Sequence, residues 1–179
     1  MTLAPRPSDA VDPLVEPQPV REIDRPAWFT LMAPGWMPPA EQVTQALGFC
    51  FTAAGMVVLV SPEDQRWTLP GGTIEPGETI EQALIREIEE EACATIITYE
   101  YLASQHVADP HHPDGPASYY QTRWWAHVSL SPWQPRHEMT NRRLVAPNRV
   151  LSTLCWADKT IAARLLDQAL TVNQRHAAG

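Results

Sequence analysis

The sequence predicts an α/β fold in which a mixed β-sheet lies between helices. Two observations indicate this fold. Several short segments have the alternating or β-branched pattern of strands, and they lie on both sides of one acid-rich helical segment. A second segment with helical periodicity, residues 158–174, follows the last strand. Strands around a central helix, with another helix at the end, favour one sheet covered by helices.

Composition limits the class of protein. A chain of 179 residues is long enough for one domain with a real hydrophobic core. The formal net charge of −8 argues against a nucleic-acid backbone as the main partner. Because no apolar run approaches membrane-spanning length and no export signal begins the chain, we expect a cytoplasmic protein without membrane contact. The cysteines are far apart and in apolar contexts, so we expect reduced core residues: Cys50, Cys93 and Cys155.

Residues 1–40 are expected to form an extension of the domain. They contain half of the chain's 18 prolines, which exclude a regular helix or a central strand. Up to about residue 19 we expect a disordered or extended tail. Residues 20–37 carry large apolar side chains, so we expect this part to pack on the domain or on a second subunit of a homodimer. The domain is expected over residues 41–175, followed by a tail at 176–179.

The first half of the domain contains two strand-like segments, residues 45–51 and 56–61, around an Ala-Ala-Gly turn. Residues 66–69 have the pattern of a strand end, and we expect Gly71-Gly72 to begin a loop. Thr79 is followed three residues later by Gln82, a capping-box pair that predicts the start of the central helix.

After the central helix, residues 95–106 predict one or two strands and residues 107–117 a loop, and residues 142–145 could form a short strand. Residues 118–130 give the clearest strand pattern. We expect its polar and aromatic face to border a ligand groove or solvent. That face carries Tyr119, Gln121, Arg123, Trp125 and His127, and the opposite one Tyr120, Thr122, Trp124, Ala126, Val128 and Leu130.

The central helical segment is rich in glutamate. Acid-rich helices are usually solvated, but on a helix turning about 100° per residue Glu87, Glu90 and Glu91 project on the same side as the apolar residues of the first turns. Glu89 points the other way and is expected to be solvated. Three carboxylates directed toward the interior repel one another unless a cation joins them. Ligands that are all oxygen suit a hard ion such as Mg²⁺ or Mn²⁺.

These residues carry a resemblance. Gly72, five residues, Glu78, seven residues and then Arg-Glu-Ile-Glu-Glu-Glu-Ala-Cys-Ala, residues 86–94, resemble the signature box of the Nudix hydrolases. The Leu-Pro-Gly-Gly lead-in is also typical of that family. One position departs, because Cys93 stands where the family has glycine and only Ala94 follows it. If the backbone there is left-handed, a residue other than glycine costs about 1 kcal/mol.

The resemblance implies an α/β/α sandwich and a metal-dependent hydrolase of nucleoside diphosphates linked to another moiety, which cleaves a P–O–P bond by attack of a metal-activated water. By motif position, Glu87, Glu90 and Glu91 would ligate Mg²⁺ or Mn²⁺, and the Gly72 carbonyl would add an oxygen. Arg86 and Glu78 would support the site. The general base would be Glu87 or Glu90, or would come from outside the box, where the candidates are Glu138 and the histidines of residues 107–117.

The substrate is less strongly indicated. Pro110 lies sixteen residues after the box, a spacing similar to the proline that marks ADP-ribose hydrolases of the family, so an ADP-ribose-like substrate is favoured. Side chains that could stack on a base or meet a phosphate are Trp67, Tyr119, Trp125 and Arg123.

Two other interpretations stay open. One is a non-catalytic Nudix domain that binds a nucleotide and regulates a partner, although every acidic position of the box is intact. The other is an isomerase of the isopentenyl-diphosphate type, which shares the fold. It would need a catalytic cysteine in a groove, whereas Cys50 and Cys93 have the contexts of structural residues.

Overall fold

The computed structural model describes residues 27–63, 65–113, 115–135, 137–156 and 159–178. Their strands form one mixed sheet in the order β1-β5-β6-β2-β3-β7, and β4 pairs with β2. The strands are β1 (Trp28–Leu31), β2 (Val43–Phe51), β3 (Val57–Ser61), β4 (Gly71–Thr73), β5 (Ala94–Ala108), β6 (Ser118–Leu130) and β7 (Asn141–Val145). The helices are the 3-10 turn η2 (Ala40–Gln42), α1 (Ile80–Ala92), α2 (Pro147–Thr153) and α3 (Lys159–Ala177).

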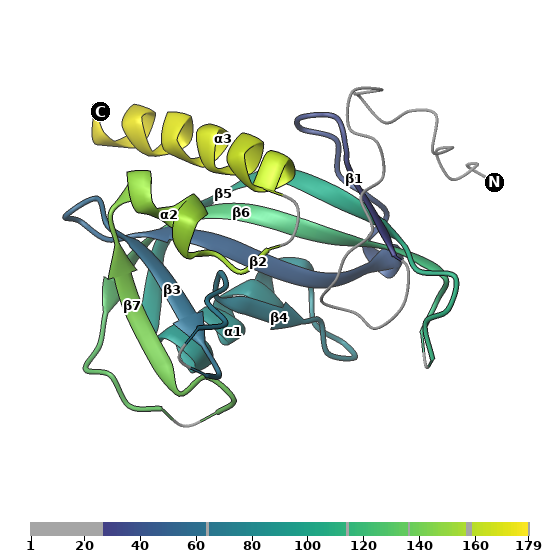
Figure 1. The fold of residues 1–179 in the computed structure, drawn as a ribbon, viewed down its shortest axis with the longest axis horizontal. Helices are drawn as coiled ribbons and strands as arrows, with labels where there is room; N and C mark the ends of the chain where they lie inside the picture. Colours follow the sequence, from purple (N-terminus) through teal and green to yellow (C-terminus); the bar gives the residue numbers. More distant parts are fainter. Residues whose placement is uncertain (1–26, 64, 114, 136, 157–158, 179) are drawn as a thin grey trace.

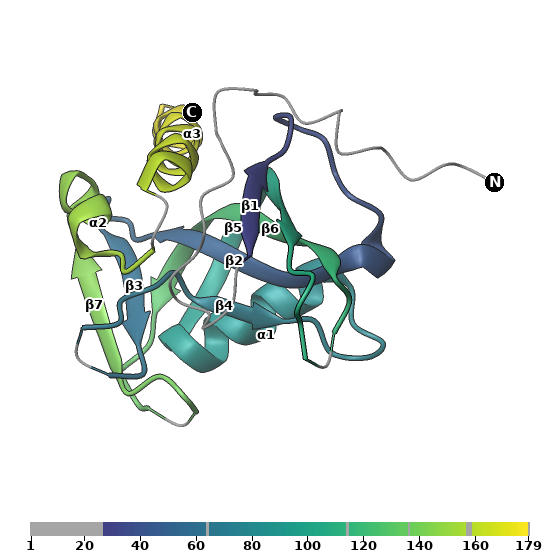
Figure 2. The same cartoon turned by 45° about the vertical axis from the view of Figure 1, so that its right-hand side comes forward.

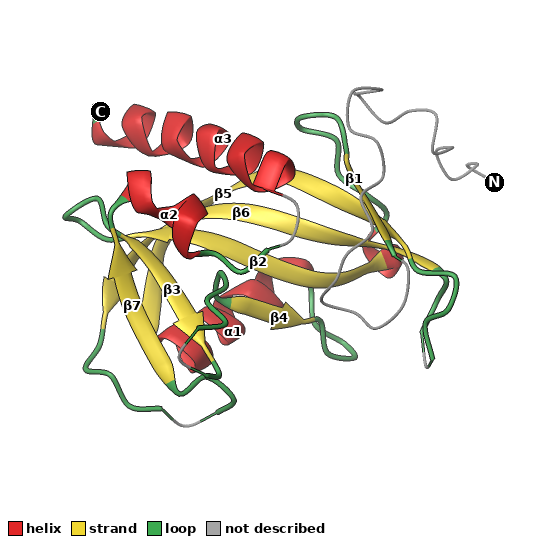
Figure 3. Cartoon of the chain, viewed as in Figure 1, coloured by secondary structure: helices red, strands yellow, loops and turns green. Residues whose placement is uncertain are grey.

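Helices cover both faces of this sheet, so the predicted α/β/α layers are confirmed (Figures 1 and 3). Helix α1 lies under one face, and α2 and α3 lie over the other, an arrangement that Figure 2 shows from the side. Each interface has its own core. Ile80, Leu84 and Ile88 of α1 pack against one face of β2 and β6, and Ile161 and Leu165 of α3 pack on the other.

The sheet is mixed because β2 runs parallel to β6 while all other pairs are antiparallel. The predicted strand at residues 118–130 is confirmed as β6, which pairs along its length with β5. The predicted strands at 45–51 and 56–61 correspond to β2 and β3. The C-terminal helix spans residues 159–177 instead of the predicted 158–174, and residue 158 lies outside the described part.

Two elements differ from the sequence predictions. Gly71-Gly72 do not begin a loop but form β4 with Thr73, paired with β2. A side chain at Gly71, where φ is +135°, would place its Cβ 2.2 Å from the carbonyl oxygen of Ala46. Glycine therefore permits the close approach on which this strand depends. Helix α2 was not predicted, although Pro147 occupies its first turn, where proline is favoured.

The polar and aromatic face of β6 is also different from the prediction. It borders neither solvent nor an open groove at Trp125, whose side chain is 1% exposed beneath α3. The α3 layer supplies a polar partner here, because the Trp125 indole N–H donates to Asn173 Oδ1 at 3.3 Å. A strand covered on both faces does not need one polar face.

The N-terminal region is only partly described. Strand β1, residues 28–31, pairs with the end of β5 at the edge of the sheet. The expected tail up to about residue 19 lies outside the described residues, and the predicted domain limits of 41 and 175 stay a prediction. No helix within the described ranges is long and apolar enough to cross a membrane.

Candidate active site

Helix α1 begins at the residue that the sequence predicts. Thr79 is the N-cap, its hydroxyl accepts from the Gln82 N–H at 3.2 Å, and the Gln82 side-chain oxygen accepts from the Thr79 N–H at 2.8 Å. This reciprocal pair satisfies two backbone donors that a helix start otherwise leaves unpaired. Because the start of the helix is fixed, the direction of each later glutamate is fixed as well.

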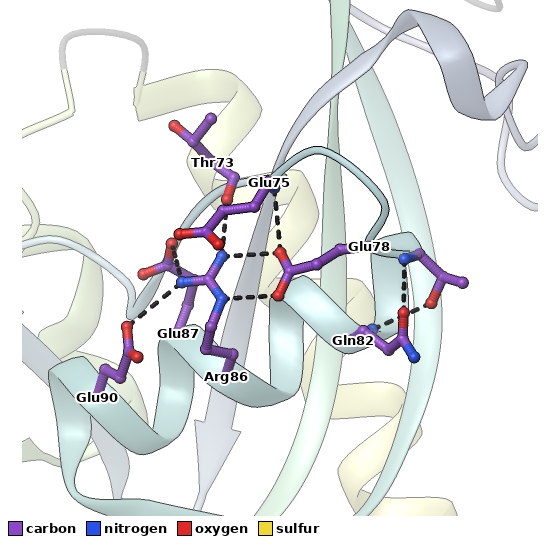
Figure 4. Close-up of polar contacts among 8 residues, drawn as sticks. Thr73, Glu75, Glu78, Gln82, Arg86, Glu87 and Glu90 are labelled. Atoms are coloured by element: carbon purple, nitrogen blue, oxygen red, sulfur yellow. Dashed lines mark hydrogen bonds and ion pairs between the residues drawn. The ribbon is translucent and has the colours of Figure 1, made fainter.

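Arg86 joins the loop before α1 to the last turns of the helix (Figure 4). Its Nε donates to Glu78 Oε1 at 2.7 Å and its Nη2 to Glu78 Oε2 at 2.9 Å. Nη1 donates to Glu87 at 3.0 Å and to Glu90 at 3.3 Å, and Nη2 also donates to the Thr73 carbonyl at 3.0 Å. The hydrogen bonds from Arg86, and then the Glu75 N–H, lower the pKa of Glu78 to about 2. Arg86 and Glu78 are therefore placed where they can support the glutamates of α1, the role that the sequence predicts for them.

Glu91 is directed inward, as the helical projection predicts. Its side chain is 6% exposed and accepts from the Gly71 N–H at 2.8 Å, so β4 and α1 meet at this carboxylate. Burial raises the pKa of Glu91 to about 8, against the effect of the Gly71 hydrogen bond, and the charge of Glu87 raises it further. Glu89 is exposed on the other side of the helix, as expected.

Gly72 lies directly opposite Glu87. A Cβ built at Gly72 would stand 2.5 Å from the Glu87 carboxyl carbon, so any side chain there would displace the carboxylate. Burial raises the pKa of Glu87, while its bond to Arg86 acts in the opposite direction. The absence of a side chain at Gly72 thus leaves room for the Glu87 carboxylate beside the backbone of β4. The carbonyl of Gly72 is part of that backbone.

Of the candidates for a base outside the box, the structure brings Glu138 to this region. Burial is the main cause of the raised pKa of Glu87 and of Glu91, and the charge of Glu138 adds to it in both cases. The histidines of residues 107–117, His111 and His112, follow the far end of β5. The start of that 15-residue strand adjoins the end of α1, so roughly 50 Å of extended chain intervenes.

Cys93, which stands where the family has glycine, has a left-handed backbone conformation with φ of 47° and ψ of 50°. It is the only described residue other than glycine with positive φ. Its N–H closes the last turn on the Glu89 carbonyl at 3.1 Å, and its thiol contacts the Gln134 carbonyl at 3.4 Å. Because the helix ends as a glycine-capped helix would, Glu90 and Glu91 keep their place in the last turn.

Among the residues that the structure describes, no three His, Cys, Asp or Glu side chains already stand in the geometry of a metal-ligand set. The hydrogen bonds explain this. Glu87 and Glu90 are turned toward Arg86, and Glu91 is bound to the Gly71 N–H. A groove of about 710 Å³ runs along the side of α1 that carries Ile85 and Glu89, and of the three carboxylates only Glu90 borders it. It is bordered by residues that include Arg86, Glu90, Cys93, Ser131 and His137.

The four residues predicted to bind substrate do not join this cluster. Trp125 and Trp67 lie in the core on the α3 side, and Tyr119 is 9% exposed with its ring edge-on to His112. Arg123 is 3% exposed on the same side of the sheet, and its guanidinium stands over the ring of Trp156 at 5.2 Å. Burial lowers the pKa of Arg123 to about 9, so the side chain stays cationic at neutral pH. Its Nε has no hydrogen-bond partner among the described residues.

Sequence reasoning missed two residues near these groups. Trp156, just before α3, was not singled out, and no periodic or motif signal marks it. Arg142 was placed only in a short strand, yet it binds the carbonyls at the end of α1. Contacts between residues 50 positions apart have no signature in a single sequence.

The fold and the site together define a class: a Nudix-type hydrolase scaffold, with its glycine strand, capped helix and cluster of glutamates. Comparison with known proteins agrees with that class. The model of the NUDIX domain matches residues 42–168, which is more than half of the chain, so the chain belongs to the Nudix family. No curated protein matches it.

Solved structures show the same fold. The pyrophosphohydrolase BsRppH of Bacillus subtilis superposes with a TM-score of 0.69 at 18% identity, over 88% of this chain and 98% of that one. A NUDIX hydrolase from Nitrosomonas europaea gives 0.55 at 17% identity, over 73% and 88% of the two chains. The NUDIX domain of Shewanella oneidensis NrtR, complexed with ADP ribose, gives 0.54 at 21% identity, over 73% and 87%. The protein is accordingly a member of the Nudix family with the Nudix fold.

Proposed function

We propose that this Nudix hydrolase requires a divalent cation and cleaves the P–O–P bond of nucleoside diphosphates linked to another moiety. The observation that carries the proposal is the crowding of Glu87, Glu90 and Glu91 beside the glycine strand. Within the described residues, the ion pairs of Glu87 and Glu90 both go to one arginine, Arg86. Such an excess of partly buried negative charge is favourable when a cation neutralises it.

The donor set fits a hard cation. Glu87, Glu90 and Glu91 with the Gly72 carbonyl would hold Mg²⁺ or Mn²⁺, since all four offer oxygen. The Glu87 carboxylate occupies the space that a Cβ at Gly72 would fill, and it therefore lies beside β4. The bonds to Arg86 use Oε1 of Glu87 and Oε2 of Glu90, so each carboxylate keeps a second oxygen. When bound, the cation would neutralise the diphosphate and lower the pKa of an attacking water.

The remaining steps belong to side chains of this chain. Arg86 and Glu78 hold Glu87 and Glu90 in orientation through fixed hydrogen bonds, an outer role of the kind that tunes ligand sites. Glu138 is the proposed general base, because its charge acts on both Glu87 and Glu91 and its side chain is exposed to solvent. Glu87 and Glu90 are the alternatives from the box itself.

The substrate proposed for the first test is ADP-ribose. One structure with this fold holds ADP ribose, and Pro110 has the spacing noted in the sequence. Pro110 itself is exposed in the β5–β6 connection, at the opposite end of β5 from α1. Arg123 is the one cation among the proposed substrate-binding residues, although its side chain is buried on the α3 side of the sheet. Gly71 and Arg123 both pair with Leu47, which places their backbones about 10 Å apart across β2.

The isomerase interpretation has little support in the structure. Cys50 is fully buried, and burial raises the pKa of its thiol well above the usual range. Cys93 holds a helix end. A non-catalytic regulator remains the second candidate, and the assay below separates it from the enzyme. The predicted cytoplasmic location and homodimer stay predictions.

The test is a panel of ADP-ribose, NADH, nucleoside triphosphates and dinucleoside polyphosphates, assayed with Mg²⁺ and with EDTA. We expect Mg²⁺-dependent release of a nucleoside monophosphate from at least one compound, and a loss of about 100-fold or more in Glu90→Gln. Glu81→Gln, in the first turn of the same helix, is the matched control and should keep its activity. No metal-dependent cleavage of any compound by the wild type would contradict the enzyme and favour the regulator.

A further inference from the structure

Arg142 on β7 lies where α1 ends and the β6–β7 connection begins. Its Nη1 donates to the Ala92 carbonyl at 2.7 Å and to the Cys93 carbonyl at 3.2 Å. Carbonyls at a helix C-terminus have no partner within the helix and carry partial negative charge. The Arg142 guanidinium donates hydrogen bonds to two of these carbonyls and places a positive charge beside them. Arg142 therefore acts as a cationic cap of α1.

The same guanidinium also holds the beginning of the connection. Nη1 and Nη2 each donate to the Ser131 carbonyl at 3.1 Å, and the Ser131 N–H donates to the Cys93 carbonyl at 2.9 Å. Arg142 stands over the ring of Trp133 at 5.3 Å. At the other end of the connection, the Thr140 N–H donates to the Ser61 carbonyl at 3.0 Å. Glu138 lies between these two anchors.

We call the hydrogen bonds of Arg142 to Ala92, Cys93 and Ser131 the Arg142 clamp, and this clamp joins the end of α1 to the β6–β7 connection. Glu90 and Glu91 occupy the last turn of α1, immediately before the capped carbonyls. Cys93, which follows them, holds a left-handed conformation without being glycine. Two hydrogen bonds therefore converge on the Cys93 carbonyl, from Arg142 and from Ser131, at the one strained residue of the helix exit.

We propose that Arg142 is a positioning residue of the catalytic site, which compensates for Cys93 at the helix exit and holds the last turn of α1 in register with the connection that carries Glu138. Its planar fork suits the task because it donates to three carbonyls from two segments at once. Arg142 acts only through Glu90, Glu91 and Glu138. The inference rests on the proposed function, since it presumes that those carboxylates bind the cation.

The test measures Mn²⁺ and Mg²⁺ binding by calorimetry at a temperature where every variant is folded, with thermal unfolding recorded in parallel. Arg142→Met should weaken cation binding about tenfold, and Arg142→Lys, which keeps the charge but not the fork, should give an intermediate value. In a Cys93→Gly background the loss caused by Arg142→Met should be smaller, since the strained residue is gone. Arg149→Met, an exposed arginine of α2, is the matched control and should bind as the wild type does.

The outcomes separate this inference from the proposed function. If the wild type binds the cation, Glu90→Gln loses it and Arg142→Met keeps wild-type affinity, Arg142 is an ordinary helix cap and the inference is overturned, although the function stands. An Arg142→Met loss of the same size with Cys93 and with Gly at position 93 would overturn the compensation. If the wild type binds no cation at millimolar concentration, the proposed function fails and the inference falls with it.

Discussion

Arg86 and Glu78 are joined by two parallel hydrogen bonds, Nε to Oε1 at 2.7 Å and Nη2 to Oε2 at 2.9 Å. This bidentate pair fixes the plane of the guanidinium, so that its third nitrogen meets Glu87 and Glu90. The loop before α1 thereby determines the orientation of two carboxylates that lie about two and three turns into the helix (Figure 4).

Lysine at position 86 should not replace this geometry. We expect Arg86→Lys to lower kcat/KM for ADP-ribose, or for whichever panel compound is cleaved, about 10- to 100-fold, because an ammonium cannot bind Glu78, Glu87 and Glu90 in a fixed plane. Steady-state kinetics and cation binding would measure the change. Wild-type kinetics in Arg86→Lys would show that charge alone suffices.

Stability of the cation-free protein should fall as the pH rises toward 8. The pKa of Glu91 is raised to about 8 from the ordinary glutamate value of 4.5, chiefly by burial. Between these values the folded state holds a proton that the unfolded state has lost, so stability is full below about 4.5 and declines through about 8. Thermal unfolding in EDTA from pH 5 to 9 would measure this decline. Glu91→Gln should flatten it, and an unchanged slope in that variant would assign the effect to other groups.

Cation binding should show the opposite trend with pH. Glu91 must lose its proton to act as a ligand, so affinity for Mg²⁺ should rise between pH 6 and 8. Calorimetry in two buffers with different ionisation enthalpies would detect the released proton. Binding without proton release at pH 7 would exclude Glu91 as a protonated residue of the free site.

Gly72→Ala should damage the site through one contact. The added Cβ would lie 2.5 Å from the Glu87 carboxyl carbon, so we expect a loss of roughly 1–3 kcal/mol in unfolding free energy and weaker cation binding. The stability cost should shrink in a Glu87→Ala background, where the clash is absent. Equal costs in both backgrounds, measured by urea unfolding, would place the strain in the backbone instead.

Replacing Cys93 with glycine should stabilise the helix exit. The left-handed backbone costs a residue with a Cβ about 1 kcal/mol, and glycine avoids this cost. Urea unfolding should show a gain of up to about 1 kcal/mol for Cys93→Gly. Cys93→Ala, which keeps the Cβ, is the control and should show no gain. A less stable Cys93→Gly would mean that the thiol contact with Gln134 outweighs the strain.

The sequence by itself determined the box and those elements whose pattern is local. The capping pair Thr79–Gln82 and the spacing of the glutamates depend on neighbours within one helix, so local periodicity was sufficient to predict where α1 begins and which side Glu91 faces. Strand β6 was equally readable, because its alternation continues over 13 residues.

Only the tertiary structure decided what covers each face and what meets at the helix end. Trp125 was expected near a groove and is buried under α3, because α3 packs on the face of β6 that carries it. Gly71-Gly72 were expected in a loop and form β4 because β2 accepts them at a distance that no side chain would allow. The clamp of Arg142 joins residues about 50 positions apart. Pairings of this kind arise from packing and non-local hydrogen bonds, which a single sequence does not encode as a local pattern.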